Sequence, residues 1–488
     1  MAWYERLSAQ DASFLVYEDQ DPAAHMHVGG LSVYEAGPLC SPTGGVDVER
    51  FRAFVASRLH MIPRYRQRLG AMPLSGDPIW VDDDHFNVRY HIRHTRLPRP
   101  GDERELKRLA GRILSQRLDR RRPLWELWLI EGLPEGRFAL VTKTHHCMID
   151  GVSGVDISTV LMQMTPDETT IAAPVPWEPR PVPPATSLAL DEIRERAKLP
   201  LDLAAATVPL LRDWRTTVAT LRANVAGLAH VSGLAWQGAA QTPLNRPIGP
   251  HRRFDWIGVD LAEAKAVKNA LGGTLNDVVL SVVTGALHAF LRRRRVNVDI
   301  LDFVATIPVN IRLPGDHEGG TKVAAWFAPL PVAERDAAAR FARVHATTTE
   351  LKQQSHADPT RYLFKLADIG GPAALRVVVA LEQGMNPSNL IVTNVPGPPF
   401  PLYVLGSRML SANPLVTLLA NQALGIAVFT YDGTMQFGFN ADWDIVPDLH
   451  ELVLDTERAF ADLRRAAGLD GAKSGVSAAE ATAASAAS

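Results

Sequence analysis

Two adjacent histidines and a carboxylate stand close together in the segment His145-His-Cys-Met-Ile-Asp-Gly151. The apolar run before them, residues 138–144, predicts a strand, so the pair would lie at a strand end. Histidine takes up and returns a proton near neutral pH more readily than other side chains. A histidine held there with Asp150 nearby is therefore a candidate general base for activating an alcohol.

The two imidazoles are poor candidates for one shared metal ion. Successive side chains of a strand point to opposite faces, so His145 and His146 cannot easily converge, and no third ligand stands at a recognisable spacing. The same geometry allows only one of the pair to face a reaction. A covalent path through a Cys147 thiolate is the alternative, but the apolar residues that follow favour a small buried hydrophobic role. We therefore expect proton transfer, with no metal.

Asp150 has two interpretations. Asp-Gly is a common turn dipeptide, and the aspartate can cap the helix expected just past Gly151. Its position four residues after a histidine pair favours instead a structural contribution to the site. In that role Asp150 fixes the loop through a buried charge partner, for which Arg312 is a candidate.

Composition sets wide limits on partners. The 488-residue chain is 46% hydrophobic and 21% charged, with a formal net charge of −2. These values are typical of a globular protein with more than one domain and give no general reason to expect nucleic-acid binding. Two cysteines, Cys40 and Cys147, are too few for a disulfide framework and favour a reducing cytoplasm.

Neither a signal peptide nor a membrane-spanning helix is predicted. The first residues lack a basic region followed by an apolar one, and residues 413–431 are better explained by two buried strands. The chain also lacks G-x-S-x-G, G-x-G-x-x-G, Walker and H-E-x-x-H motifs. Their absence disfavours serine hydrolases, dinucleotide-binding enzymes, nucleotide triphosphatases and zinc proteases.

Helix and strand signals alternate in the first 170 residues and predict a mixed α/β domain there. We expect helices over residues 51–62 and 106–114, and strands over residues 124–130 and 138–144. Six prolines between residues 171 and 190 then predict an extended linker.

The connector continues to residue 250 and is apolar and helix-prone over residues 191–240, with Trp214 and Trp236. Its charges are mixed rather than strongly basic. We therefore favour a helix pair packing on a domain over a surface that touches a membrane.

A second α/β domain is expected over residues 251–467, followed by a disordered Ala/Ser-rich tail over residues 468–488. Asp260 with Glu263, and Thr274 with Asp277, are candidate capping boxes for two helices. The second helix would end in a run of four arginines, which favours a solvated helix end over a nucleic-acid patch. Strands are predicted over residues 303–311, 323–330, 390–395 and 424–431.

The pattern H-H-x-x-x-D-G resembles the active-site motif of CoA-dependent acyltransferases. Further segments resemble, in order, the motifs of the bacterial wax ester synthase/diacylglycerol acyltransferase family, in its mycobacterial triacylglycerol synthase branch. These segments are Leu7 to Glu18, His25 to Gly30, Pro123-Leu124-Trp125, Asn276-Asp277, Pro308 to Arg312 and Asn394 to Pro398.

This resemblance implies an α/β (α+β) fold of two chloramphenicol-acetyltransferase-like domains with mixed sheets flanked by helices, joined by a long helical connector. His146 would be the catalytic base at their junction, supported by His145, and Glu18 would orient it. Asp150 and Gly151 would complete the loop. Asn276 would be a candidate oxyanion donor, and Asp277 would combine capping with a site role. The acyl channel and the domain interface would be shaped by Pro123, Leu124, Trp125, Asn394, Pro396 and Gly397.

The expected reaction moves a long-chain acyl group from acyl-CoA, a co-substrate, to diacylglycerol or a long-chain alcohol, with no other cofactor. A peripheral position on the inner membrane or a lipid inclusion would follow. Two alternatives stay open: a carrier-protein-dependent condensation or polyketide-associated acyltransferase, and a catalytically weak lipid-binding droplet protein. The oligomeric state is left open.

Overall fold

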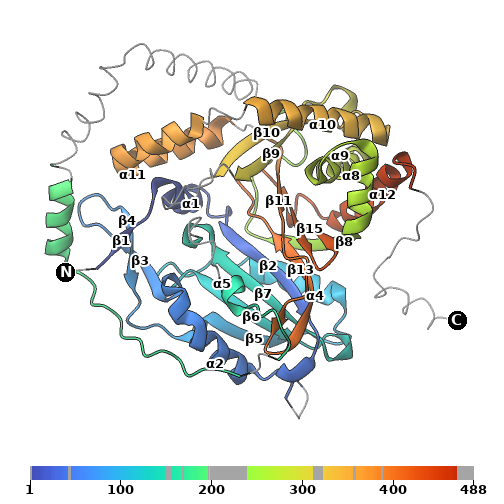
Figure 1. Ribbon diagram of the computed structural model, residues 1–488. Helices are drawn as coiled ribbons and strands as arrows, with labels where there is room; N and C mark the ends of the chain where they lie inside the picture. The colour runs from blue at the N-terminus through green and yellow to red at the C-terminus, as the bar shows by residue number, and fades with distance from the viewer. Residues whose placement is uncertain are drawn as a thin grey trace.

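The computed structural model describes residues 3–41, 45–149, 157–167, 170–195, 197, 239–310, 323–354, 359–385 and 388–469. Two mixed six-stranded sheets stand beside one another, and a small three-stranded sheet flanks the first (Figure 1). The predicted α/β fold with two mixed sheets is confirmed. The central part of the connector, residues 198–238, lies outside the described residues, as does the predicted tail from residue 470 onward.

The first sheet contains four strands from the first 150 residues and two from far along the chain. Its pairs are antiparallel except for the parallel edge pair β5–β6. In spatial order the strands are β12 (Tyr403–Val404), β13 (Ser407–Leu415), β2 (His27–Tyr34), β7 (Phe138–His145), β6 (Trp125–Glu131) and β5 (Ile92–Arg96).

In the second sheet, β11 pairs in parallel with both of its neighbours. The spatial order is β10 (Val323–Leu330), β9 (Phe303–Asn310), β11 (Leu390–Val395), β14 (Leu424–Tyr431), β15 (Thr434–Asp442) and β8 (Arg252–Asp260). The small sheet consists of β1 (Glu5–Arg6), β4 (Pro78–Asp82) and β3 (Gln67–Ala71).

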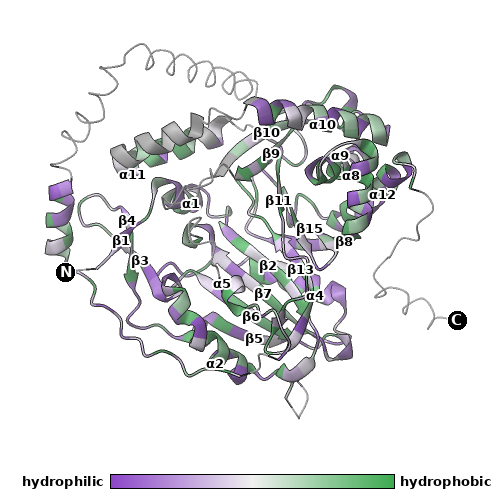
Figure 2. Ribbon diagram, in the orientation of Figure 1, coloured by the Kyte–Doolittle hydropathy of each residue, from purple (hydrophilic) through white to green (hydrophobic). Residues whose placement is uncertain are grey.

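Helices cover both sheets, and those on the surface mix polar and apolar residues (Figure 2). The α-helices are α1 (Ala9–Gln20), α2 (Val48–Arg58), α3 (Val88–His91), α4 (Glu103–Leu114), α5 (Ile157–Leu161), one over residues 185–195, α8 (Leu261–Leu271), α9 (Leu275–Arg293), α10 (Ala337–Gln354), α11 (Pro359–Met385) and α12 (Leu449–Ala466). Short 3-10 turns are η1 (Gly37–Leu39), η2 (Leu59–Met61), η3 (Pro63–Arg66), η4 (Pro134–Gly136), η5 (His146–Met148) and η6 (Val298–Ile300).

Alternation along β7 divides the first half into two apolar layers. Phe138 and Leu140 face a core that includes α2 and α5, whereas Ala139 and Val141 face a core that includes α4. This period of two is the ordinary consequence of a pleated strand buried on both faces. It places the side chain of His145, at an odd-numbered position, on the α4 face.

Strand β13 follows β11 in the chain but adds to the first sheet beside β2, from Met409↔Tyr34 to Leu415↔Gly29. It thereby covers an edge of β2 that would otherwise carry unpaired backbone groups. Residues 403–415 therefore lie in the first sheet, although the sequence placed them in the second domain. The predicted domain boundaries themselves stay a prediction. Residues 413–431 form two buried strands, as expected, but the strands belong to different sheets.

A second contact between the halves joins α4 to β8. The Nζ of Lys107 lies 2.6 Å from Oδ1 of Asp255, and the backbone N–H of Arg252 donates to Oγ of Ser115 over 2.8 Å. Phe254 of β8 packs in the same core as α4. The two halves are thus joined by apolar packing and by polar contacts, in addition to the exchanged strand.

The sequence predictions for regular elements agree closely with the structure. Strands β10, β11 and β14 have the predicted bounds, β7 and β9 differ by one residue at one end, and β6 is shifted by one residue at both ends. Thr274 and Asp277 form a complete capping box, and Asp260 caps α8, which ends at Gly272 with φ of 76°. Helix α2 ends at Arg58, before Pro63, because two 3-10 turns follow it.

Among the described helices, α9 is long and apolar enough to cross a membrane by length and composition. However, 67% of its apolar window is buried. Figure 1 shows α9 among α8, α10 and α12 beside the second sheet. It is therefore a core helix, as its neighbours in the largest apolar cluster indicate.

We expect Gly438→Ala to lower the free energy of unfolding by about 3 kcal/mol. A Cβ there would lie 1.9 Å from the carbonyl oxygen of Pro414, so β13 and β15 would have to separate. Urea unfolding measures the change. Gly384→Ala is the control, because its Cβ would meet nothing within 4 Å. Equal stability of the Gly438 variant and the wild type would contradict the proposed close crossing.

Candidate active site

His145 ends β7, and its side chain is almost completely buried on the α4 face. Its backbone N–H donates to the carbonyl oxygen of Leu124 over 2.9 Å. Its Nε2 lies 3.5 Å from Oε1 of Glu18. His145 therefore has one side turned toward a buried carboxylate that comes from helix α1.

Two groups at Cys147 face the other ring nitrogen of His145. The backbone N–H of Cys147 donates to Nδ1 over 3.2 Å, and the sulfur lies 3.0 Å from the same atom. Because Nδ1 accepts a hydrogen bond, the neutral ring carries its proton on Nε2, the nitrogen that faces Glu18.

His146 points elsewhere, because the chain leaves the strand at this residue and enters turn η5. Its ring stacks on Phe14, with centroids 3.8 Å apart and planes 17° apart. Its backbone N–H donates to the carbonyl oxygen of Met26 over 2.8 Å. Burial lowers the pKa of His146 to about 4, with a further lowering by His145 and an opposing effect of its own backbone. The imidazole is therefore neutral at pH 7 and can accept a proton.

Glu18 joins both histidines. Its Oε1 accepts the backbone N–H of Met26 over 3.0 Å, and the carbonyl of Met26 in turn holds His146. Its Oε2 lies 2.8 Å from Nη2 of Arg120 and 3.3 Å from Nη2 of Arg117. A single carboxylate thus connects His145 through its side chain and His146 through one backbone residue.

Burial alone would raise the pKa of Glu18, but other groups outweigh it. The imidazoles of His145 and His27 nearby and the N–H of Met26 hold the pKa of Glu18 well below its usual range. Glu18 is consequently ionised at neutral pH.

Further titratable groups lie on the same face of the first sheet. His27 stands opposite His145 in the β2–β7 register, and its Nε2 lies 3.8 Å from Glu18. Burial and the charge of Lys143 lower the pKa of His27 well below its ordinary value. Lys143 is itself fully buried, 3.2 Å from Glu126, and donates to carbonyls at the end of α4. His27, Lys143 and Glu126 thus form a buried polar layer on the face of the sheet that carries the His145 side chain.

Cys147 is a buried thiol rather than a nucleophile. Burial, with the charge of Asp11 as a secondary cause, raises the pKa of the Cys147 thiol well above its ordinary value. Its thiolate is therefore unfavourable. Its membership of the α2-side core agrees with the predicted hydrophobic role.

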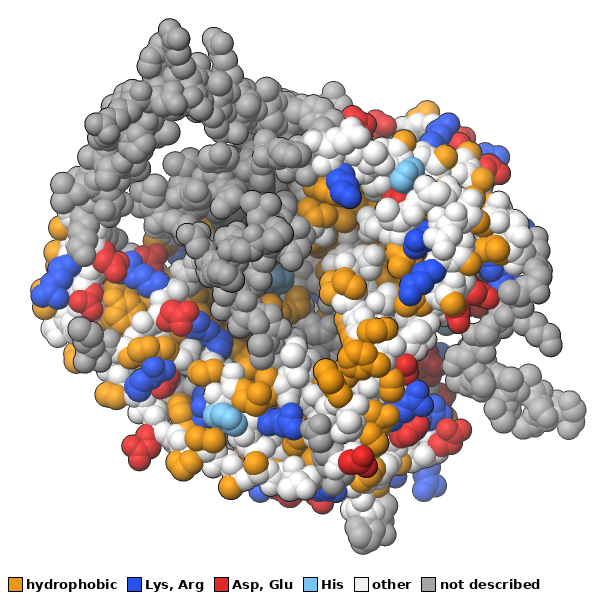
Figure 3. Space-filling model, in the orientation of Figure 1, with side chains coloured by type: hydrophobic (Ala, Val, Ile, Leu, Met, Phe, Trp, Pro, Cys, Tyr) orange, Lys and Arg blue, Asp and Glu red, His pale blue; other side chains and the backbone are white. Residues whose placement is uncertain are grey.

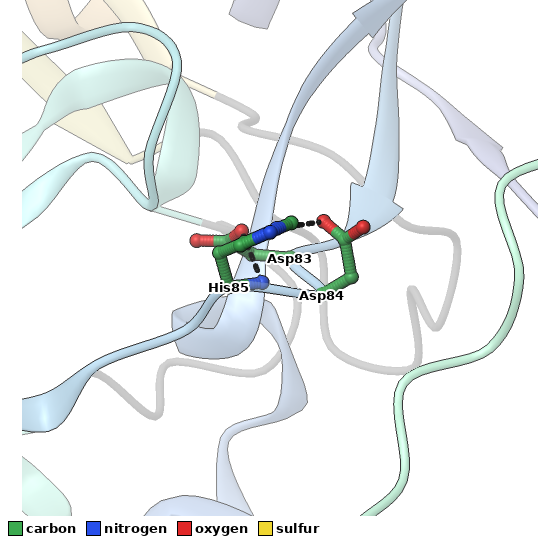
Figure 4. A group of neighbouring side chains, drawn as sticks. All are labelled: Asp83, Asp84 and His85. Atoms are coloured by element: carbon green, nitrogen blue, oxygen red, sulfur yellow. Dashed lines mark hydrogen bonds and ion pairs between the residues drawn. The ribbon is translucent and has the colours of Figure 1, made fainter.

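One group of side chains among the described residues has the composition to bind a metal ion, and it does not include the histidine pair (Figure 4). Asp83, Asp84 and His85 follow one another after β4, and Nδ1 of His85 lies 3.0 Å from Oδ1 of Asp84. Two of the three are exposed. Consecutive exposed groups that bond to one another are common without any ion, so we assign this group no role.

Several predicted site residues lie outside the described part of the chain, namely Asp150, Gly151 and Arg312. The proposed pairing of Asp150 with Arg312 therefore stays a prediction. Glu18 was expected to help orient His146; its carboxylate lies against His145 and reaches His146 through the backbone of Met26, and its orienting role stays a prediction.

Asp277 serves helix packing. Its Oδ2 accepts from Thr274 and lies 2.8 Å from Nδ1 of His345, and its Oδ1 accepts from Thr348 over 2.6 Å. These bonds fasten the start of α9 to α10, and among the described residues no hydrogen bond or ion pair joins Asp277 to the histidine pair. Asn276 is half-buried, and its oxyanion role stays a prediction.

The residues predicted to shape a channel have structural contacts of their own. Pro123, Leu124 and Trp125 are buried, and Trp125 donates from Nε1 to the carbonyl of Tyr65 over 2.8 Å. Asn394, Pro396 and Gly397 lie where the chain leaves β11 for β12, and the N–H of Gly397 donates to Oγ1 of Thr430. Their channel role stays a prediction.

Phe14 is the site residue that the sequence did not single out. It packs against the largest apolar core, which lies in the second half, and also against the α2-side core of the first half. Because His146 stacks on this ring, His146 lies where the two halves meet. The signal that could have found Phe14 is its spacing of four residues from Glu18, which places both on one face of α1.

Two mixed sheets joined by an exchanged strand, with a histidine pair at their junction, define an acyltransferase fold of the chloramphenicol-acetyltransferase type. A family model described as the wax ester synthase/diacylglycerol acyltransferase catalytic domain matches residues 7–279, and the WS/DGAT C-terminal domain model matches residues 319–464. The chain belongs to the WS/DGAT family and is an acyltransferase.

The relatives include two Mycobacterium tuberculosis proteins that are provisionally named diacylglycerol O-acyltransferases. One is 34% identical over 452 residues, covering 91% of this chain and 87% of the relative. The other, tgs2, is 32% identical over 470 residues, covering 94% and 98%. The predicted family is confirmed.

Solved structures show the same fold. The wax ester synthase/diacylglycerol acyltransferase from Marinobacter aquaeolei VT8 has a TM-score of 0.69 and 26% identity, covering 95% of this chain and 100% of that one. A starter condensation domain of rhizomide synthetase, in complex with C8-CoA and Leu-SNAC, has a TM-score of 0.56 and 13% identity, covering 96% and 97%.

We expect Glu18→Gln to lower the free energy of unfolding at pH 7 by about 3 kcal/mol, because buried partners lose their counter-charge. Since its folded pKa is depressed, Glu18 contributes this stability fully above the ordinary carboxyl value of 4.5 and loses it as the pH falls further. Wild-type stability should therefore fall more steeply below pH 4.5 than that of the variant.

Denaturant unfolding at pH 7, 5 and 4 measures both effects. Asp19→Asn is the control, since Asp19 also binds Arg120 but is exposed, and it should change stability by less than about 1 kcal/mol. Parallel pH curves for the wild type and Glu18→Gln would contradict the assigned ionisation.

Proposed function

We propose that this protein transfers a long-chain acyl group from acyl-CoA to the free hydroxyl of diacylglycerol, giving triacylglycerol. The observation that carries the proposal is the neutral His146 imidazole, stacked on Phe14 where the two halves meet. A neutral imidazole at such a place is suited to removing a proton from an alcohol.

In the proposed reaction, His146 takes the hydroxyl proton as the acceptor oxygen attacks the thioester carbonyl. A tetrahedral oxyanion forms and needs preorganised donors, for which Asn276 is the candidate. The carbon–sulfur bond then breaks, CoA leaves as a thiolate, and His146 returns the proton to it. No bond to the protein forms, in keeping with the buried Cys147 thiol.

Acyl-CoA as donor is supported by the family and by the condensation domain of the same fold that was solved with C8-CoA. Diacylglycerol as acceptor is supported by the names of the mycobacterial relatives. A long-chain alcohol is the second candidate, because the family description and the Marinobacter relative include wax ester synthesis.

We further propose that the protein is cytoplasmic and works at the surface of the inner membrane or of a lipid inclusion, because its acceptor is almost insoluble in water. The second part of α11 supports this. Val378 and Val379 are buried, whereas Val377 and Leu381 are 59% and 56% exposed. No charged residue stands between Arg376 and Glu382. An apolar outer face of this kind suits a lipid surface.

The direct test is to incubate the pure protein with one long-chain acyl-CoA and a panel of diacylglycerol, long-chain alcohols and short alcohols, and to identify the products by mass spectrometry. Triacylglycerol as the main product supports the proposal. Transfer only from a carrier-protein thioester would favour a condensation-type enzyme instead. Lipid binding without turnover would favour a droplet protein.

We expect His146→Ala to lower kcat by roughly 10²–10⁴-fold, the usual contribution of a general base, with little change in Tm. His145→Ala should lower kcat less and Tm more, because His145 is buried against Glu18 and Cys147. Steady-state kinetics and thermal melts measure the two effects. His85→Ala is the control, since that ring is 84% exposed and outside the site. Near-wild-type kcat in His146→Ala would remove it as the base.

A further inference from the structure

We propose that Phe14 is a positioning residue for His146, holding the ring in its working orientation and keeping water from one of its faces. The inference deepens the proposed function and rests on it, since it concerns the same base. The phenyl side chain of Phe14 takes no part in proton transfer, but its ring stacks on His146 with the ring centroids 3.8 Å apart.

Helix α1 presents two different faces. Ala9, Ala12 and Val16 form one apolar stripe in a cluster with Val378 and Val379 of α11. Phe14 and Glu18, one turn apart, face the histidine pair instead: Phe14 stacks on His146 and Glu18 pairs with His145. Helix α1 is thus held by α11 on one face, while Phe14 and Glu18 on another face contact the two imidazoles.

The start of α1 is also fixed. Ser8 caps the helix by accepting the N–H of Asp11, and near its other end Nε2 of Gln20 donates to the carbonyl of Arg376. Because both ends of α1 are held, the Phe14 ring loses little conformational freedom when it stacks on His146. Phe14 also packs against both large cores, so its ring is held from both halves of the molecule.

Stacking explains how His146 stays a neutral base. Nδ1 of His146 is buried, and no hydrogen-bond partner for it lies among the described residues. The phenyl ring covers one face of the imidazole and replaces water that would otherwise stabilise the imidazolium. The charged groups that act on this turn are Asp11 and Glu18 on α1, Arg120, which binds Glu18, and Arg64 of η3, while His145 is the neighbouring imidazole.

The expected consequence of losing the Phe14 ring is a change in how kcat/KM depends on pH. In the wild type the pKa of His146 is about 4, so kcat/KM should be flat from pH 5.5 upward. In Phe14→Ala, water reaches the ring and the pKa rises toward its ordinary value near 6.5. Activity at pH 5.5 should then fall roughly fivefold or more relative to pH 8. Loss of orientation should also lower kcat at pH 8 by about 10–100-fold with KM nearly unchanged.

Two further variants separate positioning from simple stability. Phe14→Tyr keeps a flat ring against His146 and should restore both kcat and the flat pH profile. Val16→Ala removes a buried side chain from the α11-facing stripe of the same helix, so it should lower Tm without an acid limb. Circular dichroism checks that each variant is folded at the assay temperature.

The decisive experiment measures kcat/KM from pH 5.5 to 9 for the wild type and these three variants. In parallel, hydrogen–deuterium exchange at the C2 position of His146, followed by mass spectrometry, measures its pKa without any substrate. An acid limb and a raised pKa in Phe14→Ala alone support the proposal. An unchanged pKa and pH profile in Phe14→Ala would overturn it. Absence of acyl transfer in the wild type would overturn the proposed function instead, while the exchange measurement still decides the role of Phe14.

Discussion

One buried carboxylate, that of Glu18, organises the site. It is almost inaccessible to solvent and would be costly to bury alone. Arg117 and Arg120, the N–H of Met26 and the ring of His145 share its charge. These partners come from three separate stretches of the chain that must meet around one atom pair. Helix α1, which carries Glu18, is therefore assembled with the segment after α4 that carries the two arginines, the start of β2 and the end of β7, and the histidine pair is formed by that assembly.

The two histidines have different environments because the strand ends between them. His145 keeps the alternation of β7 and stays on the charged, buried face of the sheet, whereas His146 enters turn η5 and reaches the apolar junction of the two halves. One imidazole is held by a carboxylate, and the other is neutral and stacked on a phenyl ring. On the face drawn in Figure 3, positive and negative side chains are interspersed, whereas Glu18 and Lys143 of this site are buried.

Local signals predicted much of this structure. Alternation and turn residues predicted β6, β7, β10, β11 and β14, and capping residues predicted the starts of α8 and α9, because these depend on near neighbours. The histidine pair stood out in the sequence, and strand alternation predicted that the two side chains would separate; in the structure they separate because β7 ends at His145 and His146 enters turn η5. The exchange of β13 between sheets, the choice of His145 as partner of Glu18 and the stack of Phe14 on His146 did not follow. Each depends on contacts between residues more than a hundred positions apart, which spacing along the chain does not encode.

The central claim is that Glu18 and His145 act as one unit in supporting His146. A double-mutant cycle of Glu18→Gln and His145→Ala, read out in kcat/KM for acyl transfer, tests it most directly. If the two act together, the double variant should lose little more activity than the worse single variant, with a coupling free energy of about 1 kcal/mol or more. Losses that simply add would contradict the claim, because they would mean that each residue supports His146 independently.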